Sequence, residues 1–195
     1  MRIAIVTDAW APQVNGVVTT LTRTSETLRG FGHEVSVVHP GAFRTFPCPS
    51  YPEIRLAWRP FSGVARRLEE ISPDRIHIAT EGPLGLAARR YCLRRQLRFT
   101  TSYHTQFPQY LRARAPVPLA VSFAFLRWFH GGAARTMVAT QRQREELRAR
   151  RFENLGAWTR GVDTQLFRPG DPEALADPRP IWIYVGRVAV EKSIE

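Results

Sequence analysis

Lysine, cysteine and long apolar runs are scarce in this sequence. Of its 28 basic Lys and Arg residues only Lys192 is a lysine, and the cysteines are Cys48 and Cys92 alone. Two cysteines so far apart exclude a disulfide framework and a zinc cluster, and they favour a reducing, cytoplasmic setting. The longest apolar stretch, 117–129, contains Arg127 and is too short to span a membrane.

Several signature motifs are missing as well. The chain has no G-x-G-x-x-G fingerprint, no P-loop, no Asp-x-Asp, no zinc-ligand spacing and no nucleophile elbow. The usual dinucleotide and nucleoside-triphosphate cradles are therefore excluded, and no nucleic-acid module is recognisable. The apolar run after Met1 is too short for a signal peptide and is typical of a first strand.

Positive charge is the feature that the sequence has in excess. The formal net charge of +11 suits nucleic acid, an anionic membrane surface or phosphorylated small molecules. Residues 112–151 hold nine arginines and two glutamates, and an apolar, aromatic segment lies among them. This combination predicts a peripheral membrane surface with four candidate residues, Arg112, Arg114, Arg127 and Trp128. Two alternatives stay open: a solvated arginine face beside a core helix, or an arginine content set by the coding composition of the genome.

Short apolar runs alternate with longer helical patterns along most of the chain. The runs predict strands at 3–7, 34–39, 75–79, 98–103, 136–140 and 181–185, and the periodic segments predict helices at 17–30, 61–71, 83–96, 117–131 and 141–151. Residues 40–60, rich in Pro, Gly and Phe, read as a loop. The alternation predicts an α/β fold with a doubly wound, Rossmann-like parallel sheet, whose ligands bind beyond the carboxyl ends of the strands.

The composition of the C-terminal part of the chain predicts where the first domain ends. A stretch rich in Pro and Asp suggests a linker at 171–180 between a first domain, 1–170, and the start of a second, 181–195. The strand 181–185 runs directly into a loop that carries Arg187 and Lys192. Two cations after a strand are able to hold a diphosphate and its growing charge.

Two further loops follow predicted strands. In the first, Asn15, Gly16 and Val17 begin a helix, a place where backbone N–H groups can bind phosphate; the alternative is a simple Asn-Gly turn. In the second, Tyr103, His104 and Thr105 end a strand, where a histidine can contact a sugar hydroxyl or transfer a proton; the alternative is a structural histidine.

The order of four segments resembles the retaining GT-B glycosyltransferases of family 4. The segments are T-D-A-W-x-P-x-x-N-G-V (7–17), S-Y-H-T-x-x-P-x-Y (102–110), R-G-V-D-T-x-x-F-x-P (160–169) and V-G-R-x-x-x-E-K-S-x-E (185–195). The chain looks most similar to the branch with GDP-mannose-dependent α-mannosyltransferases and sulfoquinovosyl transferases. The resemblance implies a GT-B N-terminal, acceptor-side domain followed by the first part of a truncated nucleotide-sugar-binding domain.

The resemblance also implies partners and roles. The donor would be a nucleotide sugar, GDP-mannose or a UDP-sugar, and the acceptor a lipid or glycan. Transfer would retain configuration and need neither metal nor cofactor. Gly16 would lie near the donor phosphates, His104 near the donor sugar, and Arg187 and Lys192 at the departing diphosphate. A non-catalytic acceptor- or membrane-binding module, and a basic nucleic-acid-binding protein, remain the alternative functions.

By this resemblance the E-x7-E segment that grips the donor would lie beyond Glu195. We therefore expect the 195-residue polypeptide by itself to show little or no turnover, because most donor contacts that stabilise the transition state would be missing. The measurement is release of GDP or UDP from GDP-mannose or UDP-sugars in the presence of lipid and glycan acceptors. Substantial transfer by the isolated chain would refute the expectation.

Overall fold

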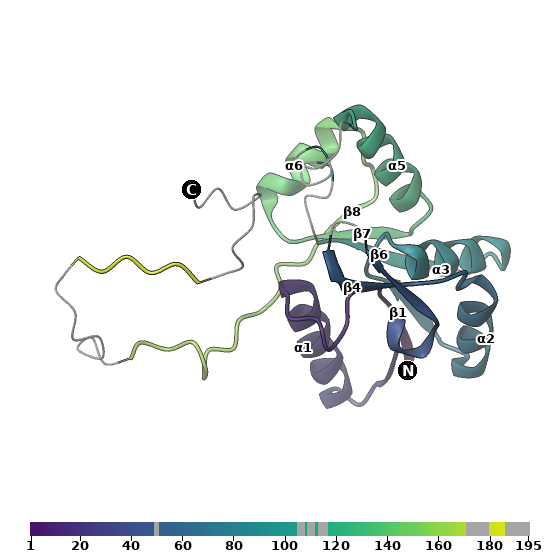
Figure 1. Cartoon of the computed structure of the whole chain (residues 1–195), viewed down its shortest axis with the longest axis horizontal. Coiled ribbons are helices and arrows are strands. Elements are labelled where there is room, and N and C mark those ends of the chain that lie inside the picture. The colour runs from purple at the N-terminus through teal and green to yellow at the C-terminus, as the bar shows by residue number, and fades with distance from the viewer. Residues whose placement is uncertain (49–50, 105–107, 109–111, 113–116, 171–179, 186–195) are drawn as a thin grey trace. The chain divides into compact units, whose positions relative to one another are not determined.

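The computed structural model describes residues 1–48, 51–104, 108, 112, 117–170 and 180–185. Its centre is a six-stranded, fully parallel sheet in the order β2-β1-β5-β6-β7-β8 (Figure 1). The strands are β1 (Arg2–Val6), β2 (Glu34–Val38), β5 (Arg75–Ile78), β6 (Phe99–Tyr103), β7 (Arg135–Val138) and β8 (Leu155–Ala157). The predicted Rossmann-like α/β fold is confirmed.

Helices cover both faces of this sheet because residues of each strand point alternately to the two sides. Leu21 of α1 packs with Ile5 on one face, whereas Ala4 and Val6 pack with Leu68 of α2 and Leu84 of α3 on the other. The helices are α1 (Gly16–Gly30), α2 (Phe61–Ile71), α3 (Pro83–Arg94), α5 (Leu119–Gly131) and α6 (Gln141–Ala149). The connections reverse direction between β1 and β5, which makes their carboxyl ends the topological switch point.

The segment 40–60 is more ordered than the loop that the sequence suggested. It contains a short 3₁₀ helix η1 (Pro40–Ala42) and an antiparallel pair, β3 (Thr45–Cys48) with β4 (Tyr51–Ala57). Prolines in the segment argued against strands, but a two-stranded ribbon pairs along one edge of each strand and tolerates Pro on the other. The prediction of a loop is therefore wrong for most of this segment.

Two further strand predictions need correction. Strand β8 was missed, because three residues that include Gly156 show no apolar period and are defined only by pairing with β7. Residues 181–185 were predicted as a strand but have no regular secondary structure. A strand forms only where a neighbouring strand takes up its backbone hydrogen bonds, and among the described strands none is laddered to 181–185.

The chain divides into two compact units, 1–159 and 160–195. The first holds the whole sheet and its helices. In the second, Asp163 Oδ1 accepts hydrogen bonds from the backbone N–H of Gln165 (3.1 Å) and Leu166 (3.0 Å), which is typical of an Asx turn. The predicted boundary at residue 170, with the linker and second domain after it, stays a prediction.

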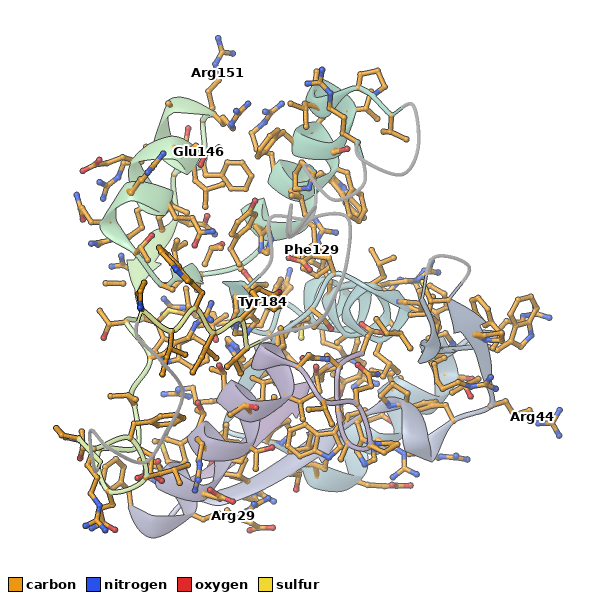
Figure 2. All side chains as sticks on the ribbon, turned by 60° about the vertical axis from the view of Figure 1, so that its left-hand side comes forward. Arg29, Arg44, Phe129, Glu146, Arg151 and Tyr184 are labelled. Carbon is orange, nitrogen blue, oxygen red and sulfur yellow. The ribbon has the colours of Figure 1, made fainter. Side chains whose placement is uncertain are left out.

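Apolar and charged side chains are sorted between the interior and the periphery of the first unit. Phe129 lies within the core, while Arg44, beside the β3–β4 ribbon, and Arg151, after α6, extend outward (Figure 2). Arginines also stack on rings at the surface: the guanidinium of Arg89 lies 4.0 Å from the ring centre of Trp128. Much of the positive charge therefore lies on solvated faces rather than in the core.

The close approach of α3 to the sheet depends on Gly85. A Cβ atom at this position would lie 1.9 Å from the carbonyl oxygen of Thr80. We expect Gly85→Ala to lower the free energy of unfolding by at least ~2 kcal/mol, because the backbone has to move. Gly131→Ala is the matched control, since its Cβ would meet nothing within 4 Å and a helical alanine costs little. Urea unfolding followed by circular dichroism measures both; equal stability of the two variants would contradict the packing argument.

Candidate functional site

Three side chains follow neighbouring strands at the carboxyl edge of the sheet. Asp8 comes after β1, Glu81 after β5 and His104 after β6, and these strands are adjacent in the order β1-β5-β6. Parallel strands bring such residues to the same edge, even when they are far apart in sequence. The candidate site is therefore this edge around the switch point.

Asp8 caps a helix that it does not belong to. Its Oδ1 accepts from the backbone N–H of Leu84 (2.9 Å), and its Oδ2 from Gly85 (3.4 Å) and from the hydroxyl of Thr80 (2.8 Å). The first N–H groups of a helix lack partners within the helix, and a carboxylate there also interacts favourably with the helix dipole. The N-terminus of α3 is thus occupied by the protein itself.

The surroundings of Asp8 leave little room. A Cβ at Gly82 would lie 2.5 Å from the carboxyl group, so the turn between β5 and α3 requires glycine there. Burial raises the pKa of Asp8, and the hydrogen bonds from Leu84, Thr80 and Gly85 oppose that shift. Asp8 therefore acts as a structural anchor of the site, and its oxygens are already engaged.

The start of α1 is arranged differently. Asn15 is its N-cap, and Asn15 Oδ1 accepts from the backbone N–H groups of Val17 and Val18, each at 3.0 Å. At Gly16 a Cβ would meet nothing within 4 Å, so the backbone there is open to approach. The predicted phosphate contact through Val17 competes with Asn15, which leaves Gly16 as the accessible part of this helix start.

Trp158 connects His104 with the start of α1. Its ring lies 5.5 Å from that of His104 and 5.9 Å from that of His77. Trp158 also packs against the apolar cluster that contains Leu21 and Val17. Gly16 and His104 thus both follow strands at the carboxyl edge, and Trp158 contacts His104 on the sheet face that α1 covers.

His77 is a polar side chain in contact with the ring of Trp158. Its Nδ1 is 2.8 Å from Thr100 Oγ1 and its Nε2 is 2.6 Å from Ser102 Oγ. Burial lowers the pKa of His77 to about 4. A neutral ring with one donor and one acceptor nitrogen satisfies both hydroxyls at neutral pH.

Glu81 is linked to a buried polar network on the opposite face of the sheet. Its Oε1 lies 3.2 Å from Nε2 of His130, and His130 Nδ1 lies 2.9 Å from Thr101 Oγ1. Tyr103, predicted as a ligand-binding residue, points to this same face and is buried in the core next to His130. Burial raises the pKa of its hydroxyl, chiefly by desolvation.

Four of the predicted residues lie outside the described parts of the chain: Thr105, Arg114, Arg187 and Lys192. Of the remaining membrane-facing candidates, Arg112 is exposed and Trp128 is 54% exposed beneath Arg89. Arg127 is partly buried and donates to the carbonyl of Arg150 over 3.3 Å, so it also ties α5 to the end of α6. No helix in the described residues is long and apolar enough to cross a membrane.

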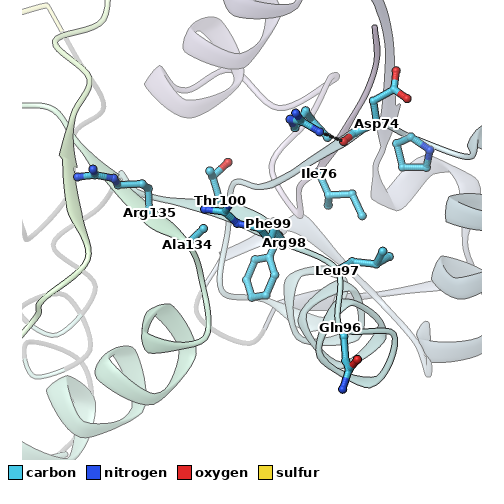
Figure 3. A pocket seen from close by; sticks show the side chains of 11 residues that line it. Asp74, Ile76, Gln96, Leu97, Arg98, Phe99, Thr100, Ala134 and Arg135 are labelled. Atoms are coloured by element: carbon cyan, nitrogen blue, oxygen red, sulfur yellow. Dashed lines mark hydrogen bonds between the residues drawn. The ribbon is translucent and has the colours of Figure 1, made fainter.

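Two hollows among the described residues of the first unit lie away from the carboxyl edge. One of about 700 Å³ is at the amino ends of β5, β6 and β7, with Asp74, Arg98 and Arg135 around it (Figure 3). Another, of about 460 Å³, lies between α2 and α3. In a doubly wound sheet the ligand-binding end is the carboxyl end, so we do not assign the catalytic site to these hollows.

The family profile of Glycosyltransferase Family 4 matches residues 14–166. The chain belongs to glycosyltransferase family 4. This match includes Gly16, Glu81, His104 and Trp158 and every strand of the six-stranded sheet except β1. The resemblance inferred from the sequence motifs is thus confirmed at the level of the family.

Curated relatives agree with this assignment. A GDP-mannose-dependent alpha-mannosyltransferase of Corynebacterium glutamicum is 30% identical over all of this chain and 53% of its own length. A sulfoquinovosyl transferase of Arabidopsis thaliana is 28% identical over 86% of this chain and 38% of its own. An alpha-monoglucosyldiacylglycerol synthase of Streptococcus pneumoniae is 30% identical over 57% and 28%. The family 4 chain spans about half the length of the mannosyltransferases that it matches.

Sequence reasoning missed several side chains at this edge of the family 4 chain, namely Asp8, Glu81, His130 and Trp158. Asp8 and Glu81 could have been found, because these carboxylates lie one and two residues after predicted strands. His130 and Trp158 carry no local signal: one is in an apolar helix and the other after a strand that was itself missed.

His77 gives the family 4 chain a pH-dependent stability. Its pKa is lowered on folding, so the unfolded chain binds more protons between about pH 6.5 and 4, and stability falls as pH falls through that window. We expect wild type to lose of the order of 2 kcal/mol there, and His77→Gln to lose less, because glutamine does not titrate. Urea unfolding at several pH values measures this, with His33→Gln as control. An identical pH dependence of wild type and His77→Gln would contradict it.

Proposed function

We propose that this chain is the acceptor-side part of a hexosyltransferase that moves a mannosyl group from GDP-mannose to a lipid or glycan acceptor with retention of configuration. The observation that carries the proposal is the alignment of the whole chain with three GDP-mannose-dependent alpha-mannosyltransferases at 28–30% identity. A UDP-sugar is the alternative donor.

The carboxyl edge suits this reaction. His104 would meet the donor sugar, since it follows β6 at the switch-point edge and its ring rests on Trp158. Gly16 would approach the donor phosphates, because nothing blocks the open backbone at the start of α1. Arg187 and Lys192 would neutralise the departing diphosphate. Guanidinium and ammonium groups would supply the charge for which other transferases use a metal ion, so transfer should persist in EDTA.

A lipid acceptor would be reached at a membrane surface. Trp128 and Val121 of α5 are 54% and 58% exposed, and the guanidinium of Arg89 lies over the Trp128 ring. Arg112 is also exposed. Exposed apolar side chains next to arginines are the composition that binds anionic bilayers peripherally. We propose attachment to the inner face of the cytoplasmic membrane by this surface.

The test is a fusion that supplies the part of the relatives that this chain does not cover. The whole chain, residues 1–195, is joined to the part of the Corynebacterium glutamicum mannosyltransferase that lies beyond the aligned region, so that Arg187 and Lys192 are kept. We expect the fusion to transfer mannose from GDP-mannose to an acceptor in a polar-lipid and glycan extract, with an α-linkage by proton NMR. His104→Ala should lower kcat by roughly 10²-fold, the usual loss when a group at the reacting centre is removed.

His33→Ala in the same fusion is the control, because His33 lies in the turn before β2, away from the carboxyl edge. Three results would count against the proposal. The folded fusion could bind GDP-mannose and transfer nothing; it could prefer another nucleotide sugar; or it could give a β-linked product.

A further inference from the structure

The side chain of Asn154 determines which group donates and which accepts in each hydrogen bond of the chain that leads to His130. The amide Nδ2 of Asn154 donates to the carbonyl oxygens of His130 (2.8 Å) and Ala133 (2.7 Å). With both N–H groups engaged, Oδ1 is the acceptor and receives the hydroxyl of Thr136 over 3.3 Å. The one hydroxyl proton of Thr136 is used in this bond, so Thr136 Oγ1 can only accept a hydrogen bond from its next neighbour.

That neighbour is Thr101, whose Oγ1 is 3.1 Å from Thr136 Oγ1 and therefore donates to it. Thr101 in turn accepts from His130 Nδ1 at 2.9 Å, so Nδ1 carries a proton. On the other side of the ring, Nε2 is 3.2 Å from Glu81 Oε1. A nitrogen and a carboxyl oxygen at that distance need a second proton between them, which the pair Glu81 and His130 shares.

The two residues of this pair differ in exposure: His130 is enclosed by the protein, and Glu81 is partly accessible to solvent. The His130 side chain is 0% exposed, whereas 19% of the Glu81 side chain remains exposed at the carboxyl edge. Among the described residues Glu81 Oε2 has no hydrogen-bond partner, while both oxygens of Asp8 at the same edge are engaged. Glu81 therefore has hydrogen-bonding capacity to offer a ligand, and Asp8 does not.

We propose that Glu81 binds a hydroxyl group of the acceptor and that His130 is the positioning residue that holds the Glu81 carboxyl group in place. This inference rests on the proposed function. A carboxyl group accepts hydrogen bonds from sugar or polyol hydroxyls, whereas it would repel the diphosphate of the donor. Because His130 fixes the side chain before the acceptor arrives, little conformational entropy is lost on binding.

The first experiment tests the positioning role in the 195-residue chain itself. Nitrogen-15 NMR of the histidine rings at pH 7 should show both His130 nitrogens protonated in wild type. In Glu81→Gln the amide can donate to Nε2, so this nitrogen should lose its proton while Nδ1 keeps its own. An unprotonated Nε2 in wild type, or no change in the variant, would overturn the positioning role.

The second experiment tests acceptor binding in the fusion described above. Glu81→Gln should raise the KM for the acceptor about 10- to 100-fold, the usual effect of losing a hydrogen bond to a charged group. The KM for GDP-mannose should stay unchanged, and so should its hydrolysis by water to GDP and mannose, because neither uses the acceptor. His130→Gln should raise the acceptor KM as well, and the double variant should be no worse than Glu81→Gln alone.

Glu70→Gln, an exposed carboxyl group on α2 that pairs with Arg66, is the matched control and should change none of these constants. An unchanged acceptor KM in Glu81→Gln would overturn the inference and leave the proposed function intact. An equal loss of transfer and hydrolysis in Glu81→Gln would also overturn it, since this would indicate general damage. A folded wild-type fusion without transfer would overturn the proposed function, and this inference with it.

Discussion

The carboxylate of Asp8 holds together the part of the molecule on which the site is built. It comes from the end of β1 and satisfies the first backbone N–H groups of α3, whose own loop supplies only Gly82 as N-cap. The same group accepts the hydroxyl of Thr80, so one side chain fixes β1, the turn after β5 and the start of α3. Because Glu81 lies between Thr80 and the start of α3, its position at the switch point depends on this interaction.

The two helix starts at this edge consequently have different uses. The start of α3 is filled by Asp8, an anion from within the chain. The start of α1 has Asn15 as a neutral cap and an open backbone at Gly16. The charges at the edge differ in the same way. The carboxyl groups of Asp8 and Glu81 lie after β1 and β5, so this part of the edge suits uncharged hydroxyl groups of a ligand better than its phosphates.

Much of the fold was predictable, and the failures have physical causes. Strands such as β1 and β5 and helices such as α2 have apolar periods long enough to be read locally. The β3–β4 ribbon and β8 were missed, because prolines masked the first and three residues gave no period in the second. Within the site, the sequence motifs identified Gly16 and His104, whereas Trp158, whose ring contacts that of His104, lies after the strand that was missed.

The sequence by itself determined the order of strands and helices, the family and the loops at the carboxyl edge, since these depend on local periodicity and on short motifs. Only the tertiary structure decided which distant residues meet: Asp8 with α3, His104 with Trp158, and Glu81 with His130, 49 positions later. Those pairings depend on the lateral order of the strands and on which face each side chain takes. Backbone hydrogen bonds and burial set both, and they act across the whole sheet rather than within any one segment.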